Sequence, residues 1–182
     1  MKKSSFLLGL ALLMCSVLIT SLAEVETFIS GNYEYSVDEK GNATIVDYDG
    51  EADTVVIPTQ LDGHSVIAIG DRSFYSCKAL SEITLPDSVT SIGDDAFTFC
   101  EALSKITLPD SVTIIGDRAF SCCDALSEIT LPDSVTSIGD KVFDFCDSLE
   151  TIILTEGSYA EQYAINEGIP YTYKNANDWL NN

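Results

Sequence analysis

The chain has 182 residues, of which 46% are hydrophobic, and its 29 acidic residues against nine basic ones give a formal net charge of −20. Such an excess of negative charge argues against binding to nucleic acid, whose phosphates would be repelled, and against binding to anionic membrane surfaces. The hydrophobic content excludes a disordered acidic tail and leaves a globular chain whose charge favours solubility.

Residues 1–23 have the layout of a secretory signal peptide. Lysines at positions 2 and 3 precede an almost unbroken apolar stretch over 6–19, and small residues stand at the cleavage positions within 21–23. The stretch is too short for a comfortable membrane span. Lipidation of Cys15 is the alternative, but a methionine precedes this cysteine where a small residue is required. We therefore predict export of a chain with no membrane span, in which seven basic and 29 acidic residues give a charge of −22.

Residues 24–56 are predicted to form an N-terminal β cap. Polar and apolar side chains alternate through Tyr33–Val37, and turn-forming residues follow at Asp38–Asn42. The chain then returns through Thr44–Val46 and Val55–Ile57, which together predict a β-hairpin.

Residues 57–154 contain about four copies of one repeat. Three copies align without gaps over 85–107, 108–130 and 131–153, and a fourth over 57–84 aligns after a five-residue insertion near Gln60–His64. A period of 23 residues is typical of leucine-rich repeats, and each unit buries its apolar face only by stacking on its neighbours. The sequence therefore predicts a β-rich solenoid of the leucine-rich-repeat class.

Columns of identical residues define the predicted core and strands. One column holds Phe74, Phe97, Phe120 and Phe143. Around Ile83-Thr84-Leu85 the alternation of apolar and polar residues predicts a strand, repeated in each coil and stacked in parallel about 4.8 Å from its neighbours. A proline follows and ends the ladder. The Gly-Asp pair before each phenylalanine predicts a turn with an aspartate cap on a short helical or irregular segment. The stretch Val89–Ile92 fits neither period and stays unassigned.

Four of the five cysteines after residue 23 recur with the same period, at Cys77, Cys100, Cys123 and Cys146. An odd number of cysteines cannot be fully paired within one chain. Because cysteine is small and easily buried, we interpret the column as core packing, with disulfides or metal ligation as the alternatives. Cys122 lies outside the column, and we expect it to be accessible while Cys123 faces the core.

Residues 155–174 are predicted to form a C-terminal helix–strand cap, followed by a tail over 175–182. Ser158 and Glu161 form a capping box before a helix over Tyr159–Glu167, and Gly168 ends that helix. A strand over Ile169–Tyr173 would then close the last coil.

The repeated run LPxSVTSIGDxAFxxCxxLxxI resembles the BspA-like leucine-rich repeats of bacterial surface proteins. The resemblance extends from Tyr33-Glu34-Tyr35 to Ile169-Pro170-Tyr171. It implies a secreted or surface-attached protein, since several family members are associated with adhesion to host proteins or to other bacteria. The larger members carry anchor modules or sorting motifs that this sequence lacks, so we expect an extracellular protein that is secreted or loosely associated with the cell surface.

The predicted ligand-binding residues are the outward-facing side chains of the strand ladder. If Ile83 faces the core, its neighbours face outward, and the same holds in the next coils, which gives Glu82, Thr84, Lys105, Thr107, Glu128 and Thr130. Lys105 interrupts a column of glutamates. The alternative interpretation is that these side chains only form a solvated strand face, in which each cross-strand pair contributes about 0.2–1 kcal/mol.

Two columns of aspartates raise the alternative of calcium binding: Asp71, Asp94, Asp117 and Asp140, and Asp87, Asp110 and Asp133. Neighbouring carboxylates in water repel by less than about 1 kcal/mol, and a capping aspartate contributes about 1 kcal/mol. The columns are therefore tolerable without an ion, and calcium-binding motifs are absent from the sequence. We predict no metal and no cofactor.

No enzyme motif is present. His64, the single histidine, lies in the insertion and is expected to be an exposed loop residue, because a catalytic base requires a nucleophile and an orienting group in the same pocket. We expect a monomeric extracellular module that binds a host or other extracellular protein or glycan without catalysis. A structural spacer without a single partner is the alternative, and a secreted hydrolase is a third hypothesis.

Overall fold

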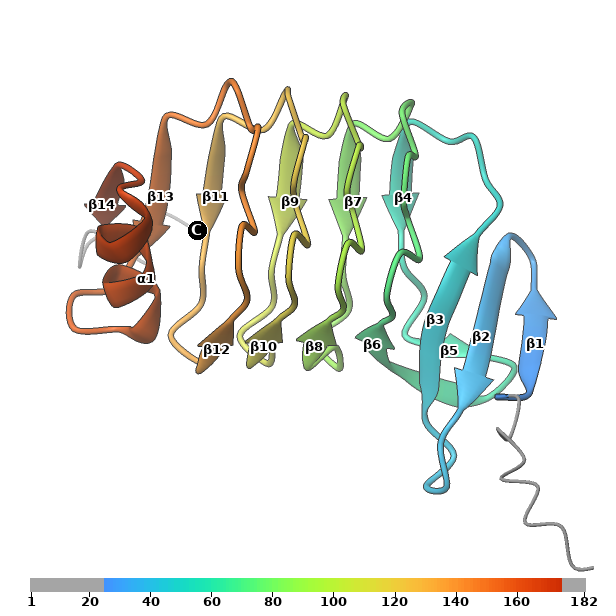
Figure 1. Cartoon of the computed structure of the whole chain (residues 1–182). Coiled ribbons are helices and arrows are strands. Elements are labelled where there is room, and N and C mark those ends of the chain that lie inside the picture. Colours follow the sequence, from blue (N-terminus) through green and yellow to red (C-terminus); the bar gives the residue numbers. More distant parts are fainter. Residues whose placement is uncertain (1–24, 175–182) are drawn as a thin grey trace, which may run out of the picture.

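The computed structural model describes residues 25–174, so the predicted signal peptide and the 175–182 tail lie outside the described residues. The chain forms the predicted β-solenoid, with antiparallel strands at its N-terminal end and a helix and a strand at its C-terminal end (Figure 1). The solenoid has about six turns, whereas the sequence predicted about four repeats. No helix among the described residues is long and apolar enough to cross a membrane.

The predicted ladder is present along one side of the solenoid. It is built from short parallel strands that lie side by side in Figure 1: β4 (Thr54–Val56), β7 (Glu82–Thr84), β9 (Lys105–Thr107), β11 (Glu128–Thr130), β13 (Thr151–Leu154) and β14 (Tyr171–Tyr173). Ile83 pairs with Val55 and Ile106 and is buried, whereas Thr84 is exposed. The ladder consists of two sheets, β4-β7-β9 and β11-β13-β14, with a break between β9 and β11.

A second parallel ladder runs along the opposite edge of each coil, in the stretch that the sequence left unassigned. It contains β6 (His64–Ile69), β8 (Ser91–Ile92), β10 (Ile114–Ile115) and β12 (Ser137–Ile138). Ile92 pairs with Ile69 and with Ile115, and all three are buried. Because most of these strands have only two residues, the alternation by which strands are predicted cannot be seen in them.

The core is a set of residue columns between the two ladders. The rings of Phe74, Phe97, Phe120 and Phe143 stack with centroids 5.3–5.8 Å apart, and Tyr48 extends this stack at the N-terminal end. The cysteine column packs beside it, because Cys100 and Cys123 are fully buried and donate hydrogen bonds from Sγ to the carbonyl oxygens of Phe74 and Phe97 at 3.1 and 3.3 Å. Cys77 and Cys146, at the ends of the column, are half-buried, as is Cys122.

The N-terminal cap contains the predicted hairpin and one more strand. β2 (Tyr33–Val37) pairs antiparallel with β3 (Ala43–Tyr48), and β1 (Thr27–Ser30) pairs antiparallel with β2. The prediction that Val55–Ile57 continues this hairpin is wrong, because β4 pairs in parallel with β7 and belongs to the ladder.

The insertion in the first repeat forms a small hairpin against this cap. β5 (Gln60–Leu61) pairs antiparallel with β6, and the Tyr35 hydroxyl donates to the Asp62 carboxylate at 2.9 Å. His64 is therefore not the exposed loop residue predicted. It lies in β6, is half-buried, and places Nδ1 2.9 Å from the carbonyl oxygen of Gly41, because the hairpin folds back onto the cap.

The aspartate column caps neighbouring coils instead of helices. The turns after each Gly-Asp pair are irregular, and the Asp71 carboxylate accepts a hydrogen bond from the backbone N–H of Asp94 at 2.9 Å. The same bond recurs from Asp117 to Asp94 and from Asp140 to Asp117, both at 2.8 Å. Each carboxylate thus satisfies a backbone donor of the next coil, which offsets the repulsion within the column.

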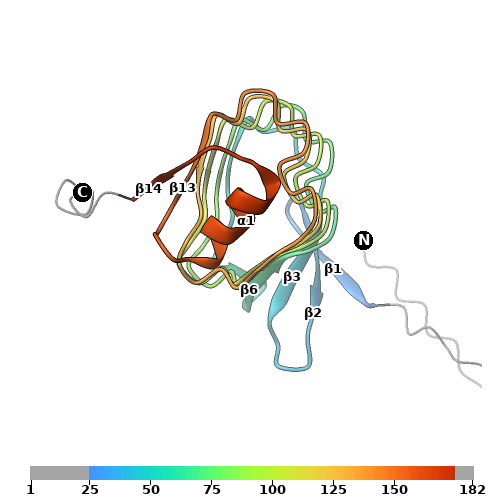
Figure 2. The same cartoon turned by 60° about the vertical axis from the view of Figure 1, so that its left-hand side comes forward.

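The C-terminal cap follows the prediction closely. α1 (Tyr159–Glu167) begins after Ser158, whose hydroxyl accepts from the Glu161 N–H at 3.2 Å, and ends at Gly168, whose φ is 68°. Figure 2 shows α1 lying across the end of the superposed coils. β14 pairs in parallel with β13 and closes the last coil.

Candidate binding surfaces

The six predicted ligand-binding side chains lie on three neighbouring strands, and we name them the ladder face: Glu82, Thr84, Lys105, Thr107, Glu128 and Thr130. Glu82 is half-buried and the other five are exposed. Lys105 does not sit evenly between its two glutamates, since its Nζ lies 2.5 Å from Oε1 of Glu82 and forms no salt bridge with Glu128 within the described part of the chain. Glu128 and the three threonines therefore keep polar groups available to a partner.

The break between β9 and β11 forms a depression in the ladder face. This open depression, about 470 Å³ in volume, is lined by residues 104–107 and 127–130. Four of the predicted residues, Lys105, Thr107, Glu128 and Thr130, line it together. The structure thus brings a cation, a carboxylate and two hydroxyl groups around one concave site.

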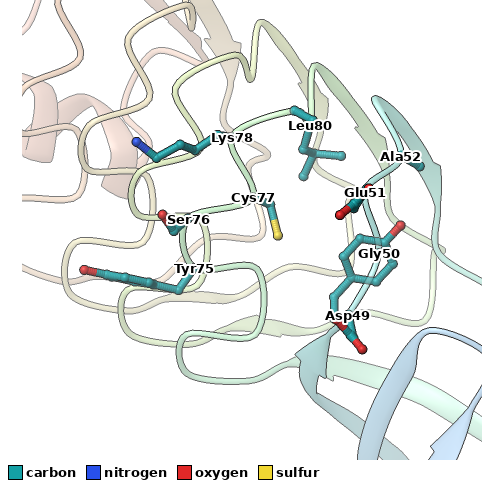
Figure 3. A pocket seen from close by; sticks show the side chains of 11 residues that line it. Asp49, Gly50, Glu51, Ala52, Tyr75, Ser76, Cys77, Lys78 and Leu80 are labelled. Carbon is teal, nitrogen blue, oxygen red and sulfur yellow. The ribbon is translucent and has the colours of Figure 1, made fainter.

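A second concave site, which the sequence analysis missed, lies where the N-terminal cap meets the first repeat (Figure 3). Only twelve positions separate Ile45 from Ile57 in the cap coil, whereas sixteen separate Ile69 from Leu85 in the next coil. The shorter coil leaves a pocket of about 480 Å³ between the loop of residues 49–52 and the turn of residues 75–80. The shortened spacing between core residues is the sequence signal that identifies it.

The chemistry of this pocket does not suggest a nucleophile. Figure 3 shows the Cys77 side chain pointing into the space between the turn and the loop. Burial raises the pKa of the Cys77 thiol, and the negative charge of Asp47 raises it further, so the thiol stays protonated near neutral pH. Lys78, at the rim, is already paired with Glu101 through an Nζ–Oε1 contact of 2.6 Å.

The aspartate columns do not converge on a common point. One column is engaged in capping the next coil, and the carboxylate of Asp133 in the other lies 3.4 Å from Nζ of Lys174. Within residues 25–174, no group of three or more histidine, cysteine, aspartate or glutamate side chains is arranged to hold a metal ion.

Comparison with known proteins agrees with this architecture. Residues 59–169 match the family described as BspA type leucine rich repeat region in six copies, which is more than the four copies predicted from the sequence. The family model therefore also counts coils that diverge from the four near-identical ones. No curated protein matches the chain.

Several solved structures are similar. A leucine-rich repeat protein from Bacteroides capillosus is 33% identical over 70% of this chain and 97% of its own, with a TM-score of 0.65. A leucine-rich repeat protein of T. pallidum is 29% identical over 71% of this chain and 72% of its own, with a TM-score of 0.58. A leucine rich cell surface protein from Faecalibacterium prausnitzii is 28% identical over 71% of this chain and 45% of its own, with a TM-score of 0.55. The chain belongs to the BspA-type leucine-rich-repeat proteins and is related to bacterial cell-surface members of that family.

Proposed function

We propose that the protein is an extracellular recognition module that binds a protein or glycan partner through the ladder face and performs no chemistry on it. The depression between β9 and β11 is the observation that carries the proposal, because Lys105, Thr107, Glu128 and Thr130 line one concave site. Repeat proteins of this kind are typically non-catalytic, and they bind through side chains displayed on a stacked scaffold.

The rigidity of the scaffold supports this role. The strands on either side of the depression are held by parallel pairing, β9 with β7 and β11 with β13, and their inward residues Ile106 and Ile129 are buried. A partner would therefore order only a few exposed side chains, which lowers the entropic cost of binding. The signal-like N-terminus and the relation to a cell-surface protein support an extracellular location.

The charge of the ladder face suggests a polar partner. Lys105 is already neutralised by Glu82, so the exposed carboxylate of Glu128 and the threonine hydroxyl groups are the groups left to form new hydrogen bonds. Hydroxyl-rich glycans and the polar surfaces of proteins both offer matching donors.

The test is a binding measurement with a double variant of the ladder face. The mature chain, residues 24–182, would be titrated by surface plasmon resonance against extracellular-matrix proteins, host glycans and bacterial surface preparations, with calcium and with a chelator. Lys105→Glu with Thr107→Arg should weaken saturable binding at least tenfold and leave the melting temperature nearly unchanged, because both side chains are exposed.

A matched control makes the same charge changes elsewhere. Lys40→Glu with Thr59→Arg alters exposed residues in the N-terminal half and should bind like the natural chain. If the ladder-face variant binds at full strength, the ladder face is not the binding surface. If the natural chain binds none of the panel, a structural spacer becomes the better hypothesis.

A further inference from the structure

The turns that follow the second ladder form a third surface with an unusual backbone. In the turn that follows each of β6, β8, β10 and β12, two residues other than glycine have positive φ angles. The first set is Arg72, Asp95, Arg118 and Lys141, with φ between 53° and 57°, and the second set is Ser76, Phe99, Cys122 and Phe145, with φ between 56° and 63°. Glycine, asparagine and aspartate adopt this conformation most easily, so large side chains here are strained.

Two phenylalanines in the second set are exposed on the surface, although Phe99 also packs edge-on against Tyr75 with ring centroids 5.5 Å apart. Phe99 is 38% exposed and Phe145 is 67% exposed, although both have left-handed backbones. A glycine at position 145 would relieve the strain and lose little buried surface, because the Phe145 ring is mostly exposed. Exposed apolar side chains that stability does not require are typical of interaction surfaces.

These rings line an open groove that crosses the coils. Phe99, Cys122 and Phe145 occupy the same position in three successive coils and line one groove of about 480 Å³. Because cysteine is much smaller than phenylalanine, the two rings stand on either side of a shorter side chain. The space above Cys122, which we name the notch, therefore lies between two exposed aromatic rings.

The groove also gathers basic residues in an otherwise acidic protein. Both arginines of the chain, Arg72 and Arg118, line it together with Lys141, and two aspartates, Asp95 and Asp144, also line it. Arg118 donates to both oxygens of the Asp95 carboxylate, from Nε at 2.9 Å and from Nη2 at 3.1 Å, and Nε of Arg72 lies 3.7 Å from the same carboxylate. Lys141 forms no salt bridge within residues 25–174, so one cation next to the notch lacks a partner.

We propose that this turn-face groove binds a protein segment that carries an apolar side chain next to a carboxylate. The apolar side chain would lie between Phe99 and Phe145, and the carboxylate would pair with Lys141 and the outer edge of Arg118. Aromatic residues and arginine around a central pocket are the usual composition of the residues that dominate protein–protein binding. A polyanion would be repelled by the chain as a whole, which favours a segment whose negative charge is local. The proposal concerns a surface separate from the ladder face and does not depend on the function proposed for it.

The experiment is an NMR titration of the ¹⁵N-labelled mature chain with a capped peptide in which two aspartates flank one tryptophan on each side. We expect saturable shifts of the backbone amides near Phe99, Cys122 and Phe145, and none on β7, β9 or β11. Replacing the tryptophan of the peptide by serine should abolish the shifts. Replacing its aspartates by lysines should weaken binding at least tenfold.

Variants of the protein separate the two parts of the site. Phe145→Gly should weaken binding of the acidic peptide at least tenfold, whereas Ser76→Gly makes the same backbone change outside the groove and should have no effect. Lys141→Glu should weaken binding by a similar factor, and Lys40→Glu, which changes the net charge equally, should not.

Three results would overturn the proposal. The first is unchanged binding to Phe145→Gly, and the second is equal binding of the acidic and basic peptides. The third is the same set of shifts produced by cellopentaose and not by the peptide, which would make the groove a carbohydrate site.

Discussion

Phe97 and Phe99 are separated by a single residue, yet Phe97 is fully buried and Phe99 is 38% exposed. The same contrast recurs two coils later, where Phe143 is buried and Phe145 is 67% exposed. Phe97 lies in the stack of rings that runs through the solenoid, whereas the left-handed backbone of Phe99, with φ of 63°, directs its ring outward. One residue type thus serves the core in one column and the surface in another.

In these two columns the backbone conformation, and not the hydrophobicity of the side chain, decides which phenylalanines belong to the core. A residue in the buried column gains stability from every contact it makes with the coils on both sides. Phe145, in the exposed column, bears a backbone strain of about 1–2 kcal/mol and recovers little of it through burial. Substitutions in the two columns should therefore have effects of opposite sign.

The largest effect is expected for a substitution in the buried column. Phe120→Ala removes a ring that stacks on Phe97 at 5.3 Å and on Phe143 at 5.8 Å, and it should lower the free energy of unfolding by about 3–5 kcal/mol. Urea unfolding followed by circular dichroism measures this. Phe145→Gly is the control and should unfold at an equal or higher urea concentration than the natural chain. Equal losses in the two variants would contradict the distinction between the columns.

A smaller loss of stability is expected for a substitution at Gly116, where two neighbouring coils approach each other closely. A Cβ on Gly116 would lie 2.4 Å from Oδ1 of Asp94 and 2.7 Å from the backbone nitrogen of Asp94, so the two coils would have to move apart. Gly116→Ala should therefore lower the free energy of unfolding by about 1–3 kcal/mol and weaken the near-ultraviolet circular dichroism of the stacked rings. Ser137→Ala, at an exposed position in β12, should leave both unchanged. An unchanged near-ultraviolet spectrum in Gly116→Ala would show that the coils tolerate the methyl group without separating.

The smallest effect is expected for the ion pair between Arg118 and Asp95, whose contribution to stability should depend on pH. The hydrogen bonds from Arg118 to Asp95 lower the pKa of this carboxyl group below its ordinary value. Since the pKa is lower in the folded state, the contribution to stability is complete above the unfolded-state value near about 4 and is lost as the pH falls through the folded-state value. Asp95→Asn should therefore be less stable than the natural chain at pH about 6, and the gap should narrow below pH about 4. Thermal unfolding at a series of pH values measures the gap, and a constant gap would show that the ion pair does not contribute.

Much of the fold could be predicted from the sequence, because most core residues recur every 23 positions. The alternation at Ile83-Thr84-Leu85 predicts the ladder, and Ser158, Glu161 and Gly168 predict the terminal helix. The second ladder could not be predicted, since a strand as short as Ser91–Ile92 has no visible period. The sequence predicts that the strand near Thr54–Val56 belongs to the N-terminal hairpin, and this is wrong because its partner, β7, lies almost thirty residues further along the chain.

The candidate surfaces were only partly predictable. Outward side chains such as Lys105 follow directly from strand alternation, so the ladder face could be located, although the break between β9 and β11 could not. The turn-face groove could not be predicted, because nothing in the sequence Thr98-Phe99-Cys100 indicates a left-handed backbone at Phe99. The sequence predicts that Cys122 is accessible, and Phe99 and Phe145 occupy the matching variable position. Their left-handed backbone could not be predicted, because no residue preference favours that conformation for phenylalanine.

The aspartate contacts between coils have a consequence for how this protein can change in length. Each carboxylate caps the residue 23 positions further on, from Asp71 to Asp94 to Asp117 to Asp140, and the donor is always the next aspartate of the column. Duplicating one complete unit of 23 residues would give every old and new carboxylate of the column the same chemical partner. An insertion of another length preserves this register only where it folds outside the coil, as the hairpin of β5 and β6 does in the first repeat. The number of coils can therefore rise or fall in whole units of 23 residues without breaking these backbone caps, and the extent of both binding surfaces would change with it.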